Sequence, residues 1–217
     1  YDMLTKYCFG AHAETGAVMA AVKEGEALPY FSAVKEGTGT RFCCPLGKDD
    51  VVFGLGETMR GIDKRGGRYV SFNTDNPHHA DDMPSLYGSH NFFIVDGEVC
   101  FGAFFDTPAR IIFEIDYEGS GKIDILAEQG VTVYLVEGES ANDIARQFLA
   151  AIGRSYLPPY GRSASGRAAG ATRRRRTCAA SPTATKRQGC RSSISVSIST
   201  IWTAISTSRS TKSAFPI

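Results

Sequence analysis

The chain has 217 residues, of which 42% are hydrophobic, and its formal net charge at neutral pH is +1. This length suffices for one large domain or two small ones with hydrophobic cores. No run of about 18 apolar residues and no basic-then-apolar opening segment occurs, so we expect no membrane span and no secretory signal. The first residue is Tyr1 rather than Met, which suggests a fragment, and the expected location is the cytoplasm.

The near-neutral total conceals two parts of opposite composition. All 23 Asp and Glu lie in residues 1–160, whereas residues 161–217 hold 11 of the 24 Lys and Arg and contain no Leu. The change follows the segment Leu157-Pro158-Pro159-Tyr160. We therefore interpret the two parts separately.

The six cysteines show no C-x-x-C spacing, which is the pattern that structural zinc sites favour. Reduced, partly buried thiols are the expected state. We predict no metal site and no cofactor.

Short apolar runs separated by glycine-rich turns dominate residues 30–136, whereas residues 1–30 show little periodicity. Ile111, Phe113 and Ile115 alternate with polar or outward positions, a period of two that indicates a strand. Asp96-Gly97 is a strong hairpin signal. Strands are predicted at 30–31, 41–44, 51–53, 68–72, 92–95, 98–105, 111–117, 123–125 and 131–135. This spacing favours a mainly β fold with an N-terminal β-sandwich over residues 1–139.

One helix is predicted after the sandwich. Ser140 is a favourable N-cap, and Ile144, Phe148, Leu149 and Ile152 form an apolar stripe. Gly153 is predicted to end the helix in the left-handed conformation. The two prolines that follow favour an extended chain, so residues 140–160 are interpreted as a linker helix and an extended exit.

Four strings occur in order along the first part of the chain. They are Phe-Gly-Leu-Gly-Glu at 53–57, Asn-Thr-Asp at 73–75, Leu-Tyr-Gly-Ser-His-Asn-Phe-Phe at 86–93, and Phe-Gly-Ala-Phe-Phe-Asp-Thr-Pro at 101–108. Together they resemble the N-terminal β-sandwich of glycoside hydrolase family 31, the α-glucosidase and α-xylosidase group. The resemblance covers roughly residues 40–160.

The resemblance implies that a catalytic (β/α)₈ barrel follows the sandwich and supplies an Asp nucleophile and an Asp acid/base. Such an enzyme hydrolyses terminal α-linked glucosides or xylosides with retention, which requires two carboxyl groups. The sandwich would lend only a loop, residues 73–87, to the rim of the sugar pocket. The substrate-binding candidates implied are Asp75, His78, Tyr87 and His90, and no catalytic residue is expected in this chain.

Structural interpretations compete at several of these residues. Asp75 could instead cap a turn, and Tyr87 could instead pack under the loop. His78 and His79 stand close to Asp81 and Asp82, but a solvated loop explains them better than a metal site. Two further motifs have structural interpretations only: Glu57 is expected to brace a turn, and Phe101–Phe105 to lie in the core.

Residues 161–217 are basic and rich in Ser and Thr, and their composition predicts a disordered or poorly formed tail. One arginine run at 173–176 and a scarcity of aromatic residues argue against a nucleic-acid-binding arm, so no nucleic acid is expected as a partner.

A frameshift after Tyr160 explains this tail more fully. Reading the implied codons one base earlier allows 161–172 to become Trp-Ala-Phe-Gly-Phe-Gly-Gln-Gly-Arg-Trp-Gly-Tyr. The same shift converts 197–205 to Val-Asp-Ile-Asp-Tyr-Met-Asp-Gly-Tyr. Both strings resemble the first strands of the family 31 barrel.

The sequence therefore favours a truncated glycoside hydrolase whose catalytic carboxylates are missing. Two alternatives stay open. One is a free-standing carbohydrate-binding β-sandwich, which requires an exposed aromatic platform. The other is a basic-tailed binding protein, which predicts salt-dependent binding to nucleic acid.

Overall fold

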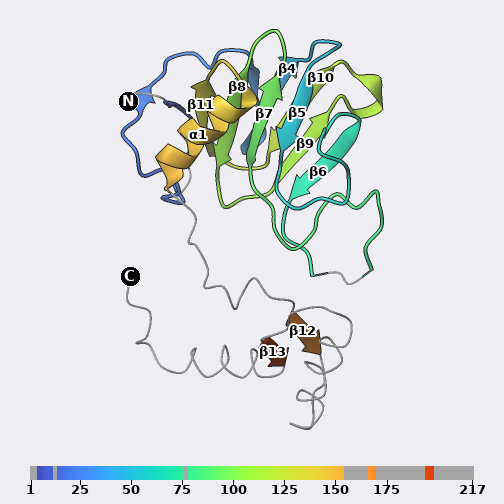
Figure 1. The fold of residues 1–217 in the computed structure, drawn as a ribbon. Helices are drawn as coiled ribbons and strands as arrows, with labels where there is room; N and C mark the ends of the chain where they lie inside the picture. The colour runs from blue at the N-terminus through green and yellow to red at the C-terminus, as the bar shows by residue number, and fades with distance from the viewer. Residues whose placement is uncertain (1–3, 12–13, 76–77, 154–165, 170–193, 198–217) are drawn as a thin grey trace. The chain divides into compact units, whose positions relative to one another are not determined.

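The computed structural model describes residues 4–11, 14–75, 78–153, 166–169 and 194–197, and the chain divides into two units at Arg154 (Figure 1). The first unit contains a six-stranded and a five-stranded sheet, and every strand pair in them is antiparallel except the short β1–β2 pair. The six-stranded sheet consists, in spatial order, of β2 (Lys23–Glu24), β1 (Thr5–Phe9), β11 (Val131–Glu137), β8 (Phe101–Asp106), β7 (Phe92–Asp96) and β5 (Val51–Gly54). The five-stranded sheet consists of β3 (Ser32–Glu36), β4 (Gly39–Pro45), β10 (Lys122–Ala127), β9 (Ile111–Ile115) and β6 (Gly67–Ser71).

Side chains from both sheets form one hydrophobic core. Phe105 of the first sheet packs edge-on against Phe42 and Phe113 of the second, with ring centroids 5.3 and 5.9 Å apart. On β9 the predicted alternation is confirmed, because Ile111, Phe113 and Ile115 are buried and the residues between them are not. The fold is therefore the predicted β-sandwich.

The helix α1 (Ala141–Ile152) adds a third layer on the outer face of β7, β8 and β11 (Figure 1). Phe148 stacks on Phe92 at 3.8 Å, and Ile144 is fully buried among residues of this outer layer. Because β11 is covered on both faces, Val131–Val136 are all buried. The helix and its Ser140 N-cap are confirmed: the Ser140 Oγ accepts a hydrogen bond from the Asp143 amide at 3.3 Å.

Three local predictions are wrong. Residues 30–31 form no strand: Tyr30 has a φ of 64° and stacks on Phe101 at 4.6 Å, so its apolar character reflects packing. The returning strand of the β7–β8 hairpin begins at Phe101 rather than at residue 98. Gly153 ends α1 at φ 89° and ψ 167°, a glycine conformation other than the left-handed one.

Two strands, β1 and β2, lie in the first 30 residues, where none was predicted. A short 3₁₀ turn, η1 (Tyr117–Gly119), connects β9 to β10. No helix in the described residues is both long and apolar enough to cross a membrane.

The second unit covers Ser155–Ile217, and the structure describes only two short strands of it. β12 (Gly166–Ala169) pairs in parallel with β13 (Ile194–Ser197). The predicted extended exit at 157–160 and the remainder of the predicted tail lie outside the described residues.

Candidate functional site

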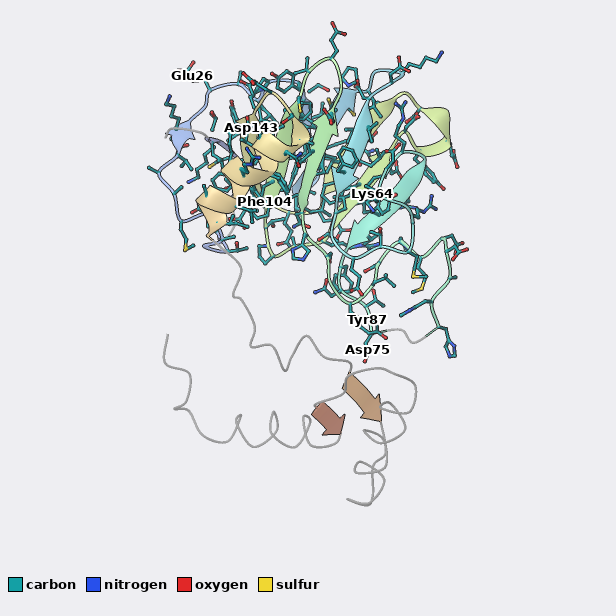
Figure 2. All side chains as sticks on the ribbon, viewed as in Figure 1. Glu26, Lys64, Asp75, Tyr87, Phe104 and Asp143 are labelled. Carbon is teal, nitrogen blue, oxygen red and sulfur yellow. The ribbon has the colours of Figure 1, made fainter. Side chains whose placement is uncertain are left out.

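The connection between β6 and β7, residues 72–91, projects from one end of the sandwich. Figure 2 shows Asp75 and Tyr87 at the far end of this loop, directed away from the sheets. The four substrate-binding candidates all lie on it, and the structure separates them into two places. Asp75 and Tyr87 lie at the tip, whereas His90 lies at the base, two residues before β7.

Hydrogen bonds hold the two arms of the loop together near its base. The Asn73 Oδ1 accepts from the Ser89 amide at 3.0 Å and from the Ser89 hydroxyl. The Thr74 amide donates to the Leu86 carbonyl at 2.8 Å, and the Thr74 hydroxyl lies 3.1 Å from the Ser85 Oγ. These two hydrogen-bonded arms, residues 72–74 and 85–91, form a stalk that holds the tip of the loop.

Glu57 braces this stalk, as the sequence predicted. Its amide donates to the Gly88 carbonyl at 3.1 Å, and its Oε2 accepts from the Gly88 amide at 2.9 Å. The neighbouring Gly56 has a φ of 73°, and a Cβ placed there would lie 2.8 Å from the His90 amide nitrogen. Only glycine fits between these two segments without displacing one of them.

The tip carries polar side chains that face solvent. Asp75 and His78 are exposed, and the Asp75 carboxylate has no hydrogen bond to another described residue. Tyr87 is 45% exposed, and its ring meets the His79 ring edge-on at 5.6 Å. Tyr87 is thus an exposed part of the tip and is not packed under the loop.

An open hollow of about 440 Å³ lies at the loop's base, between the end of β6, the start of β7 and the end of β8. Its lining includes His90 but not Asp75, His78 or Tyr87. The lining also includes the polar residues Thr15, Ser71, Asn73, Asn91 and Asp106.

Two polar contacts fix the wall of this hollow. Asp106 is 1% exposed and accepts from the Thr15 hydroxyl at 2.5 Å and from the Thr15 amide at 3.4 Å. The Asn91 Nδ2 donates to the Phe105 carbonyl at 3.1 Å, while its Oδ1 accepts from the Ser71 hydroxyl. Both contacts join segments distant in sequence, so the hollow is preformed.

The sequence interpretation missed this hollow. Thr15 lies in a region where no periodicity guided prediction, and Asp106 appeared only as part of a family-like string. Asn73 belongs to another of these strings, and nothing in the sequence predicts its hydrogen bonds to Ser89. Only the fold brings these residues together, so no sequence pattern indicated the hollow itself.

The described residues contain no group of three or more His, Cys, Asp or Glu side chains that could hold a metal ion. This finding applies to the two adjacent pairs on the β6–β7 loop, His78-His79 and Asp81-Asp82. All four of these residues are described by the structure and are exposed.

A family model matches residues 22–114, and its description is glycosyl hydrolase 31 N-terminal galactose mutarotase-like domain. Residues 22–114 therefore carry a glycoside hydrolase 31 N-terminal domain. The match includes both arms of the β6–β7 loop and most strands of the sandwich.

Curated relatives of this glycoside hydrolase 31 domain are α-glucosidases. The chain is 31% identical over 110 residues to an α-glucosidase of Saccharolobus solfataricus, covering 50% of this chain and 16% of that protein. It is 30% identical over 148 residues to α-glucosidase 2 of Bacillus thermoamyloliquefaciens, covering 65% and 18%. The chain thus spans less than a fifth of the length of these two relatives.

Solved structures share the fold of the glycoside hydrolase 31 domain. A Flavobacterium johnsoniae GH31 dextranase mutant in complex with isomaltotriose matches with a TM-score of 0.63 and 24% identity, covering 76% of this chain and 20% of the dextranase chain. A cycloalternan-degrading enzyme from Trueperella pyogenes matches with a TM-score of 0.64 and 21% identity, covering 79% and 27%.

Proposed function

We propose that this chain is the N-terminal, non-catalytic part of an α-glucosidase-type glycoside hydrolase that acts on terminal α-linked sugars with retention. The observation that carries the proposal is the family match over residues 22–114, supported by two relatives named as α-glucosidases. The proposed substrates are α-linked glucosides or xylosides.

The chemistry of the described sandwich agrees with a non-catalytic role. Retaining hydrolysis needs two carboxyl groups about 5 Å apart, one as nucleophile and one as acid/base. Among the described residues that line the hollow, Asp106 is the only carboxylate, and Thr15 covers it. The two catalytic carboxylates are therefore expected in the barrel of the intact enzyme.

The β6–β7 loop is proposed to form part of the rim of the sugar pocket. Its stalk is braced by Glu57 and Asn73, and its tip presents the exposed side chains of Asp75 and Tyr87. The Asp75 carboxylate has no hydrogen-bond partner among the described residues, and such an exposed carboxylate can accept hydrogen bonds from sugar hydroxyls in the complete enzyme. Asp75 is the residue we expect to contribute most to substrate binding.

A frameshift after Tyr160 is proposed as the reason why residues 161–217 contain no acidic residue. The nucleotide sequence around codon 160 tests this directly. We expect a one-base shift to restore a frame that encodes the start of a family 31 barrel. An intact frame with the present tail codons, found on resequencing, would remove the proposal.

A cytoplasmic location is proposed as well. Among the described residues, Cys8, Cys43, Cys44 and Cys100 are all free thiols, the state that a reducing compartment maintains.

The rim proposal is tested in the frame-restored protein by replacing Asp75 with Ala. Loss of a charged hydrogen bond to the sugar should lower kcat/KM for isomaltose at least about tenfold. Asp81→Ala, on the same exposed loop, is the matched control and should leave kcat/KM unchanged. Equal effects of the two substitutions would refute a specific role for Asp75.

A further inference from the structure

We propose that the hollow at the base of the β6–β7 loop is a separate binding site for one neutral pyranose unit of an α-linked glucan. The site lies in the sandwich itself and does not depend on the catalytic barrel. Neither Asp75 nor Tyr87 lines it, so it is distinct from the rim proposed above.

The size and the surface of the hollow suit a sugar. Its volume of about 440 Å³ falls within the range of about 300–1,000 Å³ typical of small-molecule sites. Phe72 lines it and is 63% exposed, which is unusual for a large aromatic side chain next to a concave surface. A pyranose has an apolar C–H face that packs on such a ring, and burying both surfaces is favourable.

Polar groups around Phe72 can pair with sugar hydroxyls. The Asn73 Nδ2 has no hydrogen-bond partner among the described residues, although its Oδ1 is held by Ser89. The exposed imidazole of His90 likewise makes no hydrogen bond to another described residue, and it lines the same hollow. A buried sugar hydroxyl needs such partners, because an unpaired one loses its hydrogen bonds to water.

The charge of the lining selects a neutral ligand. Among the described residues around the hollow, none is Lys or Arg, and Asp106 contributes a carboxylate. Phosphate and carboxylate groups are normally bound by Arg, Lys or clustered amides. Sugar phosphates and nucleotides are therefore excluded as ligands, whereas uncharged glucans are accepted.

The hollow requires little rearrangement to bind. Beyond the contacts of Asn91 and Asp106, the Thr107 hydroxyl donates to the Gly130 carbonyl at 3.0 Å and accepts from the Ala109 amide at 3.2 Å. These bonds fix the turn from β8 to β9 that forms one wall. A preformed site loses little conformational entropy on binding.

The test is an NMR titration of the complete 217-residue chain with isomaltotriose. We expect saturable shifts of the amides of Asn73, His90 and Asn91, with a dissociation constant in the millimolar range. Phe72→Ala should weaken binding at least about fivefold, because the stacking surface is lost. Ile62→Ala removes an exposed apolar side chain outside the hollow and outside the β6–β7 loop, and it should leave the affinity unchanged. Glucose 6-phosphate should not compete.

Three results would overturn the inference. They are no saturation at tens of millimolar, equal weakening by Ile62→Ala and Phe72→Ala, and competition by glucose 6-phosphate. Circular dichroism spectra and thermal unfolding of both variants check that each is folded. The proposed function can fail independently: an inactive frame-restored protein whose sandwich still binds isomaltotriose through Phe72 would refute the proposed function and leave this inference standing.

Discussion

Asp124 lies on the outer face of the five-stranded sheet, where it is 8% exposed and contacts two cations. The Arg41 Nη1 lies 2.9 Å from one carboxylate oxygen, and the Lys122 Nζ lies 2.8 Å from the other. Burial raises the pKa of Asp124, whereas the hydrogen bonds and charges of Lys122 and Arg41 lower it. The lowering is the larger effect, so the pKa of Asp124 is below its ordinary value. The carboxylate therefore stabilises the fold in its charged form.

This pKa shift predicts a loss of stability in acid. Because the folded-state pKa is lower than the unfolded one, the contribution of Asp124 is present above about pH 4 and is lost as the pH falls through the folded value. Asp124→Asn should lower the free energy of unfolding by about 1–2 kcal/mol at pH 7, and by much less at pH 3. Urea unfolding at both pH values measures this.

The control is Asp49→Asn, at an exposed position, which should change stability by less than about 0.5 kcal/mol at either pH. A pH-independent effect of Asp124→Asn would contradict the role assigned to its ion pairs.

Phe105 is the residue on which the core depends most. It is fully buried and packs against four other rings, those of Phe31, Phe42, Phe93 and Phe113. Phe105→Ala should lower the free energy of unfolding by about 3–5 kcal/mol, because it leaves a cavity between the sheets. The urea midpoint, compared at unchanged m-value, measures the loss. A loss of under about 1 kcal/mol would mean that the two sheets do not share this core.

At the scale of the element, α1 depends on a single cap and a single face. Ser140 satisfies the Asp143 amide, and Ile144 is fully buried against the sheet. Ser140→Ala should lower the free energy of unfolding by about 1 kcal/mol, whereas Ser140→Asp, which keeps an acceptor, should be nearly neutral. Thermal unfolding compares the three proteins, and an unchanged stability of Ser140→Ala would show that the cap contributes nothing.

The β6–β7 loop depends on a hydrogen bond to the Glu57 side chain, as α1 depends on its cap. Glu57→Ala removes the acceptor for the Gly88 amide and should accelerate hydrogen exchange at Gly88 and Ser89 by at least about tenfold. Glu57→Gln keeps an acceptor and should exchange nearly as slowly as the original. Unchanged exchange in Glu57→Ala would show that the stalk is held by other contacts.

The elements that the sequence predicted well are those whose pattern is local. β9 shows a period of two, β7 ends at Asp96-Gly97, and α1 begins with a cap and an apolar stripe. β1 was not predicted, because a strand of five residues that pairs with β11 gains its stability from contacts more than 120 positions away. The strand predicted at residues 30–31 is absent, because aromatic residues favour both burial and strand formation and Tyr30 packs without forming a strand.

The same distinction between local patterns and tertiary contacts applies to the candidate site. The loop and its Glu57 brace follow from motifs that resemble a family, so they were predicted. The hollow combines Thr15, the base of the loop and the end of β8, three segments that only the tertiary fold brings together. Its exposed aromatic residue, Phe72, had been interpreted as the end of a strand, because sequence alone gives no measure of exposure.

At the scale of the whole molecule, the sandwich with α1 is one compact unit with two hydrophobic clusters, and the family-model match over residues 22–114 lies entirely within it. The chain spans only 16% and 18% of its two α-glucosidase relatives, so most of the corresponding enzymes has no counterpart in it. The acid-free composition of residues 161–217 begins where the resemblance predicts a barrel. These observations together support the central proposal that, in the intact enzyme, this sandwich is followed by a catalytic barrel.

The most direct test of that claim is the hydrolysis of p-nitrophenyl α-D-glucoside by two proteins: the present 217-residue chain and the product of the locus with its frame restored after codon 160. We predict no hydrolysis by the first and hydrolysis with release of the α-anomer by the second, followed by NMR. Hydrolysis by the present chain, or a restored product that leaves α-glycosides intact, would contradict the account.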